Sequence, residues 1–132
     1  MNYFEDQKKV LLIAEIGVNH NGDVVLAKEM ITAAKECGAD AVKFQTFSAE
    51  SLASADTPKV KYQESTTASS ETHFQMLKKL ELSRDDHYDL NEYCKDSDIK
   101  FLSTPYDIDS AEFLNSLNIE MFKTASADLV DI

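Results

Sequence analysis

Short apolar runs alternate with helix-like segments along most of the chain, and this alternation constrains the fold more than any other feature. The apolar runs occupy residues 10–16, 41–47, 100–104 and 121–125. Apolar residues recur at helical spacing in residues 24–37, 71–80, 84–96 and 109–117. Strands that alternate with helices are typical of parallel β-α units. The sequence therefore predicts an α/β fold, and both an open doubly wound sheet and part of a barrel remain possible.

The predicted helices have recognisable ends and buried faces. Gly38 is expected to end the first helix in a left-handed conformation. Ser83 is placed as the N-cap of the helix that reaches residue 96, with acidic residues in its first turn and with Leu90 and Cys94 on its buried face. The last helix is expected to bury Phe113 and Leu114.

Length and composition narrow the class of protein. The chain has 132 residues, which suits one domain over residues 1–132, and a formal net charge of −11, which excludes a general nucleic-acid binder. It contains no apolar stretch of the roughly 18 residues that a membrane span needs. The charged start lacks a signal-peptide cleavage pattern, so a cytoplasmic location is expected, with Cys37 and Cys94 as buried thiols.

Polar residues lie in or just after the carboxyl-terminal part of each predicted strand, where parallel α/β folds bind their ligands. They are Glu15, Lys43, Gln45, Ser103, Thr104, Lys123, Ser126 and Asp128. Because strand side chains alternate, Lys43 and Gln45 should share one face, while Val42 and Phe44 pack against helices. The polar stretch at residues 48–70 is too long for an ordinary connector and is expected to be functional or mobile.

Lys43 and Lys123 are unusual because each is a lysine flanked by apolar residues within a predicted strand. Burying an ammonium without a partner costs several kcal/mol. An anion bound between the two lysines is one explanation. The alternatives are an internal salt bridge with a carboxylate such as Glu15 or Asp128, or exposure to solvent.

Other candidate sites have simpler interpretations. Residues 19–23 (NHNGD) resemble a strand-to-helix turn and cap more than a metal site. His73 and His87 lie in charged helical stretches, so surface positions are expected for both. No glycine-rich nucleotide-binding motif is present, and the chain has only three glycines.

Four ordered motifs resemble the sialic acid synthases, a family that includes N-acetylneuraminate, legionaminate and pseudaminate synthases. The motifs are residues 14–22 (AEIGVNHNG), 39–47 (ADAVKFQTF), 101–107 (FLSTPYD) and 122–126 (FKTAS). The resemblance implies that the chain forms the N-terminal half of a TIM (β/α)₈ barrel. A sequence departure follows the fourth motif: the family often has glycine and then glutamate where this chain has Ala127 and Asp128.

The resemblance implies a reaction between phosphoenolpyruvate and an N-acyl hexosamine that gives a nine-carbon 2-keto sugar acid and phosphate. Glu15 and Lys43 would then be catalytic. The implied substrate-binding residues are Gln45, Tyr62, Ser103, Thr104, Lys123, Ser126 and Asp128. Lysines and hydroxyls would hold the phosphate and carboxylate of phosphoenolpyruvate, while Glu15, Gln45 and Tyr62 would face the sugar.

Family members also use a divalent metal, manganese or magnesium, and the histidines that bind it lie in a part of the barrel that this chain does not contain. The resemblance also implies a small C-terminal antifreeze-like domain in the family, which we expect this chain to lack, and a homo-oligomer is expected. We therefore expect the chain to be inactive alone. The main alternative is a non-catalytic remnant of the fold that acts as a binding or scaffolding module, and another phosphoenolpyruvate-condensing or aldolase-type barrel is a third.

Overall fold

The structure is a computed structural model that describes residues 10–53 and 72–126. Its elements follow one another as β1 (Ile13–Gly17), α1 (Val24–Glu36), β2 (Ala41–Thr46), α2 (Ala49–Leu52), α4 (His73–Leu80), α5 (Arg84–Asp96), β3 (Lys100–Pro105) and α6 (Ile108–Ser116). The first three predicted strands and the long helices are therefore confirmed to within a few residues. The short helix α2 lies in a stretch that was predicted only as a long connection.

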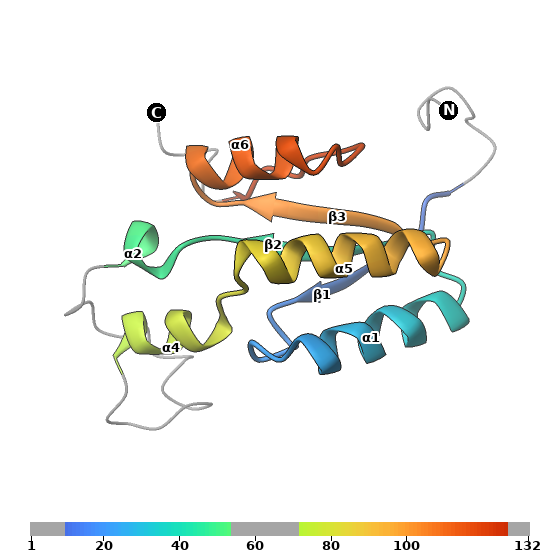
Figure 1. The fold of residues 1–132 in the computed structure, drawn as a ribbon, viewed down its shortest axis with the longest axis horizontal. Helices are drawn as coiled ribbons and strands as arrows, with labels where there is room; N and C mark the ends of the chain where they lie inside the picture. Colours follow the sequence, from blue (N-terminus) through green and yellow to red (C-terminus); the bar gives the residue numbers. More distant parts are fainter. Residues whose placement is uncertain (1–9, 54–71, 127–132) are drawn as a thin grey trace.

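The three strands form one parallel sheet in the order β1-β2-β3 (Figure 1). Ile13 lies opposite Ala41, and Gln45 lies opposite Thr104. The fourth predicted strand, residues 121–125, is reduced to a single parallel bridge between Ser103 and Phe122. The prediction of a regular strand there is wrong for the described residues, because one bridge does not make the repeated ladder that defines a strand.

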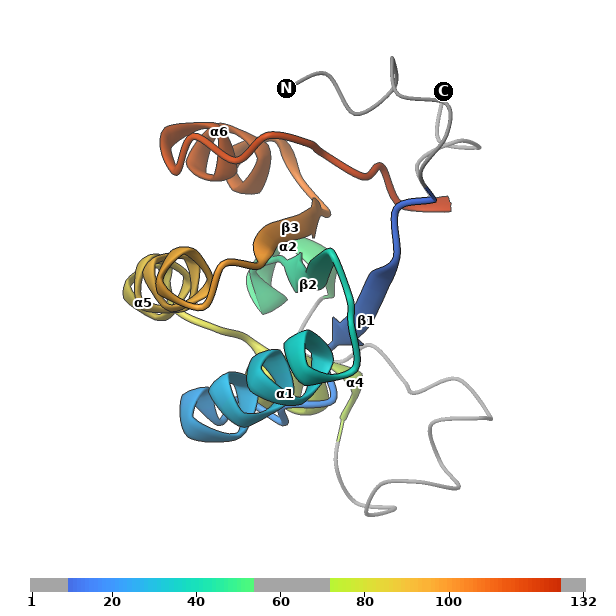
Figure 2. The same ribbon diagram turned by 90° about the vertical axis from the view of Figure 1, so that its right-hand side faces the viewer.

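The three long helices α1, α5 and α6 lie on the same side of the sheet (Figure 2). An open doubly wound sheet carries helices on both faces, whereas a barrel carries them only on its outer face. The placement of the helices therefore decides between the two predicted architectures. The parallel strands and their helices form part of a (β/α)₈ barrel.

The hydrophobic core lies between the sheet and these helices. Val42 and Phe44 are fully buried there, and Phe44 stacks on Phe101 with ring centroids 5.3 Å apart. Ile31 of α1 and Leu114 of α6 close the core from the helical side. The alternation predicted for β2 is confirmed, since Val42 and Phe44 face the helices and belong to the core.

Capping side chains fix where the helices begin and end. Asp23 accepts hydrogen bonds from the backbone N–H groups of Val25 and Leu26, which confirms the predicted turn and cap. Ser83 and Asp86 form a reciprocal capping box at the start of α5. Gly38 follows α1 with a φ of +86°, as predicted for a left-handed helix end.

Two side chains lie where the sequence analysis did not place them. Cys37 is exposed because it is the residue directly after the last turn of α1, whereas Cys94 is buried, and burial raises the pKa of its thiol to about 12. His87 is 1% exposed rather than on the surface. It shares one face of α5 with the buried Leu90 and Cys94, and the charged neighbours in sequence concealed this spacing. Within the described ranges, no helix is long and apolar enough to cross a membrane.

Gly22 makes the closest backbone approach in the turn between β1 and α1. Its φ is +76°, and a Cβ atom built there would lie 2.2 Å from the carbonyl oxygen of Lys79 in α4. We expect Gly22→Ala to lower the free energy of unfolding by about 3 kcal/mol, because left-handed strain and overpacking add. Urea denaturation followed by circular dichroism measures the loss.

Gly38→Ala is the matched control for that substitution. Gly38 has a φ of +86°, but no heavy atom lies within 4 Å of the Cβ that alanine would add. Only the backbone strain of about 1–2 kcal/mol remains. Equal losses in the two variants would show that the contact with α4 contributes nothing.

Candidate active site at the carboxyl ends of the strands

A pocket of about 460 Å³ lies at the carboxyl ends of the strands. Its lining residues are Glu15, Gly17, Val18, Asn19, Lys43, Gln45, Thr104, Tyr106, Lys123, Ala125 and Ser126. Six of the sequence-predicted site residues therefore share one cavity: Glu15, Lys43, Gln45, Thr104, Lys123 and Ser126. Tyr62 and Asp128 lie outside the residues that the structure describes.

Lys43 is the buried cation of this pocket. Its side chain is 9% exposed and its Nζ lies 2.7 Å from Glu15 Oε2, while the Glu15 side chain is 54% exposed. Nζ also donates hydrogen bonds to Glu15 Oε1 at 2.9 Å and to Thr104 Oγ1 at 3.2 Å. Of the alternatives that the sequence left open for Lys43, the internal salt bridge with Glu15 is the one present.

Glu15 lies directly opposite Lys43 in the parallel register of β1 and β2, and the regular strand breaks just after this pair. The register of β1 against β2 shifts between Glu15 and Gly17, so Ile16 is an extra residue in the strand. Gly17 adopts a φ of +58°, and a Cβ atom there would lie 3.2 Å from Glu15 Oε1 and 3.6 Å from Gln45 Nε2. Glycine at this position therefore allows both polar side chains to approach the backbone at the mouth of the pocket.

Lys123 differs from Lys43 in its surroundings. It is exposed, and its Nζ donates a hydrogen bond to the carbonyl oxygen of Thr124 at 3.0 Å. Of the alternatives that the sequence left open for Lys123, exposure to solvent is the one present, because the segment that carries it meets the sheet through one bridge. Lys123 nevertheless lines the pocket together with Lys43.

The charges of the pocket favour an anion. The described lining contains two lysines and one glutamate, so it carries a net positive charge although the whole chain is strongly acidic. The hydroxyls of Thr104 and Ser126 and the amide of Gln45 add neutral hydrogen-bonding groups. Such a set suits phosphate and carboxylate groups.

Ser103 does not reach this pocket. In the parallel register it lies opposite Phe44 of β2, so the two share the helix-facing side of the sheet. Ser103 is fully buried there, and its Oγ lies 2.6 Å from Thr46 Oγ1. Thr46 in turn lies 2.9 Å from His87 Nε2. The structure therefore separates Ser103 from the other predicted site residues.

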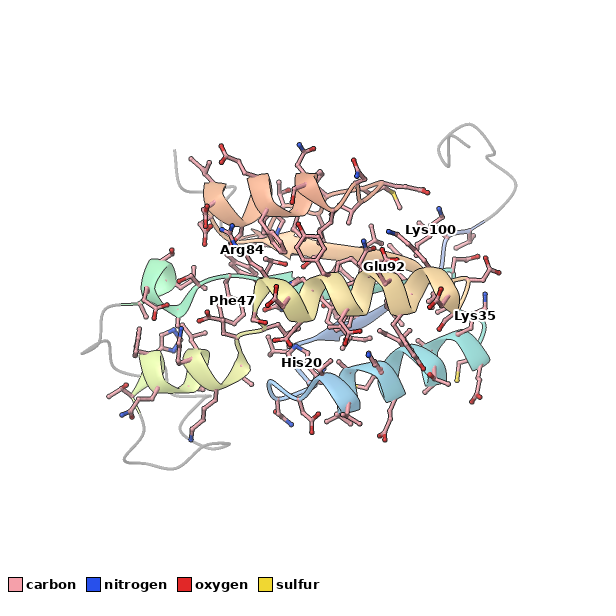
Figure 3. The ribbon with its side chains drawn as sticks, viewed as in Figure 1. His20, Lys35, Phe47, Arg84, Glu92 and Lys100 are labelled. Carbon is pink, nitrogen blue, oxygen red and sulfur yellow. The ribbon has the colours of Figure 1, made fainter. Side chains whose placement is uncertain are left out.

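Two buried histidines lie behind the pocket. His20 lies between α1 and α5 in Figure 3, and its Nδ1 accepts a hydrogen bond from the Gly22 backbone N–H at 3.0 Å. Burial lowers the pKa of His20, while the Gly17 carbonyl opposes this shift and His87 adds to it. Burial also lowers the pKa of His87, opposed by the Ser83 carbonyl and Asp86. Both imidazoles are thus held in their neutral form.

The lowered pKa values predict a loss of stability in mild acid. A histidine with a folded-state pKa below its ordinary value of 6.5 stabilises the fold above pH 6.5, and this contribution disappears as the pH falls towards the folded pKa. We expect the urea midpoint of the chain to fall between pH 7.5 and pH 5. His87→Phe, which cannot be protonated, should show a shallower fall. An equally steep fall in that variant would contradict the prediction for His87.

A larger cavity of about 680 Å³ lies at the opposite end of the strands, near Lys35 and Lys100. Figure 3 shows these two lysines at the end of the molecule remote from Phe47, which follows β2. Lys35 pairs with Asp98, and Lys100 pairs with Glu120. These lysines have carboxylate partners, as Lys43 has, but the cavity lies at the amino ends of the strands, whereas parallel α/β folds bind their ligands at the carboxyl ends.

The chain is similar to several synthases of acidic sugars. It is 49% identical over 121 residues to the N,N'-diacetyllegionaminic acid synthase of Legionella pneumophila, and the aligned region covers 92% of this chain and 34% of that protein. It is 38% identical to the N-acetylneuraminate-9-phosphate synthase of Homo sapiens, over 92% of this chain and 34% of the human protein. The chain thus spans about a third of the length of these relatives.

A solved structure and a family model agree with these relatives. The N-acetylneuraminic acid (sialic acid) synthetase of Leptospira borgpetersenii, solved in complex with citrate, matches with a TM-score of 0.76 and 30% identity, over 92% of this chain and 38% of that one. The model of the NeuB family matches residues 30–132, which is more than half of the chain. The chain therefore belongs to the NeuB family.

Proposed function

We propose that this chain supplies the phosphoenolpyruvate-binding part of a sialic acid synthase-type active site. The reaction joins phosphoenolpyruvate to the open-chain aldehyde of an N-acyl hexosamine, gives a nine-carbon 2-keto sugar acid and releases phosphate. The observation that carries the proposal is the pocket that gathers Lys43 and Lys123 with the hydroxyls of Thr104 and Ser126. The names of the relatives support the reaction class.

Binding of phosphoenolpyruvate begins with an exchange of partners at Lys43. Its Nζ donates hydrogen bonds to Glu15 and Thr104. An incoming phosphate or carboxylate replaces Glu15 as the acceptor of the Lys43 ammonium. The Glu15 carboxylate is half exposed, so water solvates it with little loss of free energy when Lys43 leaves. Lys123 and Ser126 line the same pocket and offer the anion a second ammonium and a hydroxyl.

The fixed charges then assist the bond changes. The enol carbon of phosphoenolpyruvate attacks the aldehyde carbon, and the C–C bond forms as the aldehyde C=O π bond opens and its oxygen takes up a proton. Positive character develops at the carbon that bears the phosphate. Water adds there, loses a proton, and the tetrahedral species expels phosphate as its C–O bond breaks. Lysines held in a pocket stabilise the departing phosphate. Glu15, released from Lys43, orients the sugar or moves a proton near the aldehyde, beside Gln45.

A divalent manganese or magnesium ion is the cofactor expected for such a synthase. Within residues 10–53 and 72–126, no group of three His, Cys, Asp or Glu side chains could hold a metal ion. Both ring nitrogens of the buried His87 already lie within hydrogen-bond distance of other groups. The described residues therefore do not fit the ion, and no step above depends on it.

Glu15→Gln should change affinity and turnover in opposite directions. Removing the carboxylate frees Lys43 for the substrate, so we expect phosphoenolpyruvate to bind about fivefold more tightly, which corresponds to ~1 kcal/mol at a half-exposed pair. Turnover in a mixture with the remaining part of a relative's synthase should fall, because the carboxylate that orients the sugar or moves a proton is lost. Glu29→Gln, the same charge change at an exposed residue of α1, should alter neither quantity. Weaker binding in Glu15→Gln would contradict the exchange of partners.

Two measurements test the proposed function. Phosphoenolpyruvate titrated into the ¹⁵N-labelled chain should shift amides of the pocket-lining residues before any others. The chain mixed with the part of the Legionella pneumophila relative that follows the matched region should release phosphate from phosphoenolpyruvate and an N-acyl hexosamine, while the chain alone should not. If neither effect appears, the enzyme proposal fails and a non-catalytic binding or scaffolding module remains.

We also propose that the chain self-associates. On the sheet and its edge, large apolar side chains are exposed, including Leu12 at 54%, Ile13 at 42% and Phe122 at 47%. Exposed apolar side chains beside unpaired strand edges favour association between copies. Light scattering coupled to size-exclusion chromatography measures the mass, and a stable monomer at micromolar concentration would contradict this proposal.

A further inference from the structure

A chain of buried hydrogen bonds runs behind the pocket, on the helix-facing side of the sheet. Ser103 Oγ lies 2.6 Å from Thr46 Oγ1, which lies 2.9 Å from His87 Nε2. His87 Nδ1 lies 2.8 Å from the carbonyl oxygen of Ser83. Ser103, Thr46 and His87 are 0%, 5% and 1% exposed. We call these three side chains and the Ser83 carbonyl the His87 relay.

The direction of every hydrogen bond in the His87 relay is determined. The Ser83 carbonyl can only accept, so His87 Nδ1 carries the proton. His87 is neutral because burial lowers its pKa, and its Nε2 therefore accepts from the Thr46 hydroxyl. The Thr46 oxygen is then the acceptor for the Ser103 hydroxyl. One tautomer of His87 satisfies the relay, and the other breaks it.

The relay touches the pocket through the backbone. Thr46 follows Gln45 in β2, Ser103 precedes Thr104 in β3, and Gln45 lies opposite Thr104 in the parallel register. The Thr46–Ser103 hydrogen bond thus ties the two strands together beside the two pocket-lining residues. Lys43 donates to Thr104 Oγ1, so the position of Thr104 also affects Lys43.

The imidazole is itself held in place on several sides. The ring of His87 packs edge-to-face on Phe113 of α6, with centroids 5.6 Å apart, and on Phe101 of β3 at 6.4 Å. Ser83 is the N-cap of α5, so the relay connects the strand ends to the start of that helix. An imidazole fixed by two aromatic rings and a helix cap is a rigid support for the Thr46 hydroxyl.

We propose that His87 is a positioning residue of the pocket, which acts through Thr46 and Ser103 to fix the carboxyl ends of β2 and β3, and thereby Gln45, Thr104 and Lys43. This inference rests on the proposed function, because phosphoenolpyruvate is the ligand whose binding it supports. His87 lies behind the sheet and touches no ligand. Ser103, expected from the sequence to bind substrate, acts instead through this relay.

Two isosteric substitutions cut the relay at different bonds. Glutamine places its amide near the position of imidazole Nε2, so His87→Gln retains an acceptor for Thr46. Asparagine reaches only the position of Nδ1, so His87→Asn retains a donor to the Ser83 carbonyl but leaves Thr46 without its acceptor. We expect phosphoenolpyruvate affinity, measured by titration of the ¹⁵N-labelled chain, to fall at least tenfold in His87→Asn and to stay within threefold in His87→Gln.

Two further variants separate positioning from stability. Thr46→Val removes the centre of the relay while keeping the shape of the side chain, and should weaken binding as His87→Asn does. Cys94→Ala destabilises the same buried face of α5 without touching the relay, and should leave the affinity unchanged. If His87→Asn and Thr46→Val bind as the wild type does, or if Cys94→Ala weakens binding equally, the positioning role is overturned.

The tautomer of His87 gives a readout that does not depend on any ligand. Nitrogen chemical shifts at pH 7 should show His87 protonated on Nδ1, and protonation on Nε2 would overturn the relay. A wild-type chain with the expected tautomer that binds no phosphoenolpyruvate identifies a failure of the proposed function. A wild-type chain that binds phosphoenolpyruvate beside an unaffected His87→Asn identifies a failure of the positioning role alone.

Discussion

Lys43→Met is expected to weaken phosphoenolpyruvate binding about 100-fold while the chain stays folded. A hydrogen-bonded charge contact is worth up to ~3 kcal/mol, and each 1.4 kcal/mol corresponds to a factor of ten. Lys43 supplies the buried ammonium of the pocket, so methionine removes the main attraction for an anion. Calorimetry or the amide titration measures the change.

The stability of Lys43→Met follows from the exposure of its partner. Removing one member of a buried ion pair costs several kcal/mol when the other charge is left without solvent. Glu15 is 54% exposed and keeps its hydration, and methionine fills the space of the lysine stem. We therefore expect a free energy of unfolding within about 1 kcal/mol of the wild type.

Lys100→Met is the matched control for charge. Lys100 pairs with Glu120 near the amino ends of the strands, so its substitution changes the net charge equally but lies away from the pocket. Its affinity for phosphoenolpyruvate should match that of the wild type. Equal losses in the two methionine variants would mean that overall charge, and not the pocket, governs binding.

Phe44→Ala is expected to cause the largest loss of stability, about 3–5 kcal/mol. Phe44 is fully buried, stacks on Phe101 at 5.3 Å and lies 5.9 Å from the His20 ring. Close-packed cores relax only in part, so truncation leaves a cavity. Since small domains are stable by only about 5–15 kcal/mol, a large part of the variant should be unfolded at moderate urea concentrations.

Phe122→Ala provides the comparison at an exposed phenylalanine. The Phe122 side chain is 47% exposed, and its residue meets the sheet through one bridge. We expect a change within about 0.5 kcal/mol. Urea denaturation of both variants measures the difference, and a smaller loss in Phe44→Ala than in Phe122→Ala would refute the assignment of the core.

The strand alternation was predictable from sequence because its physical cause is local. Side chains of a strand point alternately to its two faces. The apolar Val42 and Phe44 mark the face that packs on the core, so Lys43 must lie on the opposite face. Ser103 and Thr104 were both predicted to bind substrate, yet neighbours in a strand face opposite ways. Only the pairing register, which places Thr104 opposite Gln45, decides which of the two reaches the pocket.

The burial of His87 and the exposure of Lys123 both have non-local causes. His87 is surrounded in sequence by charged residues, but its side chain packs on Phe101 and Phe113. These two contacts lie far away in sequence, so the neighbouring residues do not predict them. Lys123 has apolar neighbours within a predicted strand, so the sequence left open whether it is buried beside an anion or a carboxylate or exposed to solvent. The segment makes only one bridge to β3, so the lysine is exposed. Burial in both cases depends on partners distant in sequence.

The alternation of β2 has a consequence for how such a pocket can diverge. Val42 and Phe44 contribute to the core, whereas Lys43 and Gln45 line the pocket on the opposite face. Substitutions at Lys43 or Gln45 can therefore change the substrate with little loss of folding stability. Substitutions at Val42 or Phe44 change the packing of the core without changing the lining of the pocket. Thr46 and Ser103 are where this independence ends, because their hydrogen bonds link the helix-facing side to the strand ends that shape the pocket.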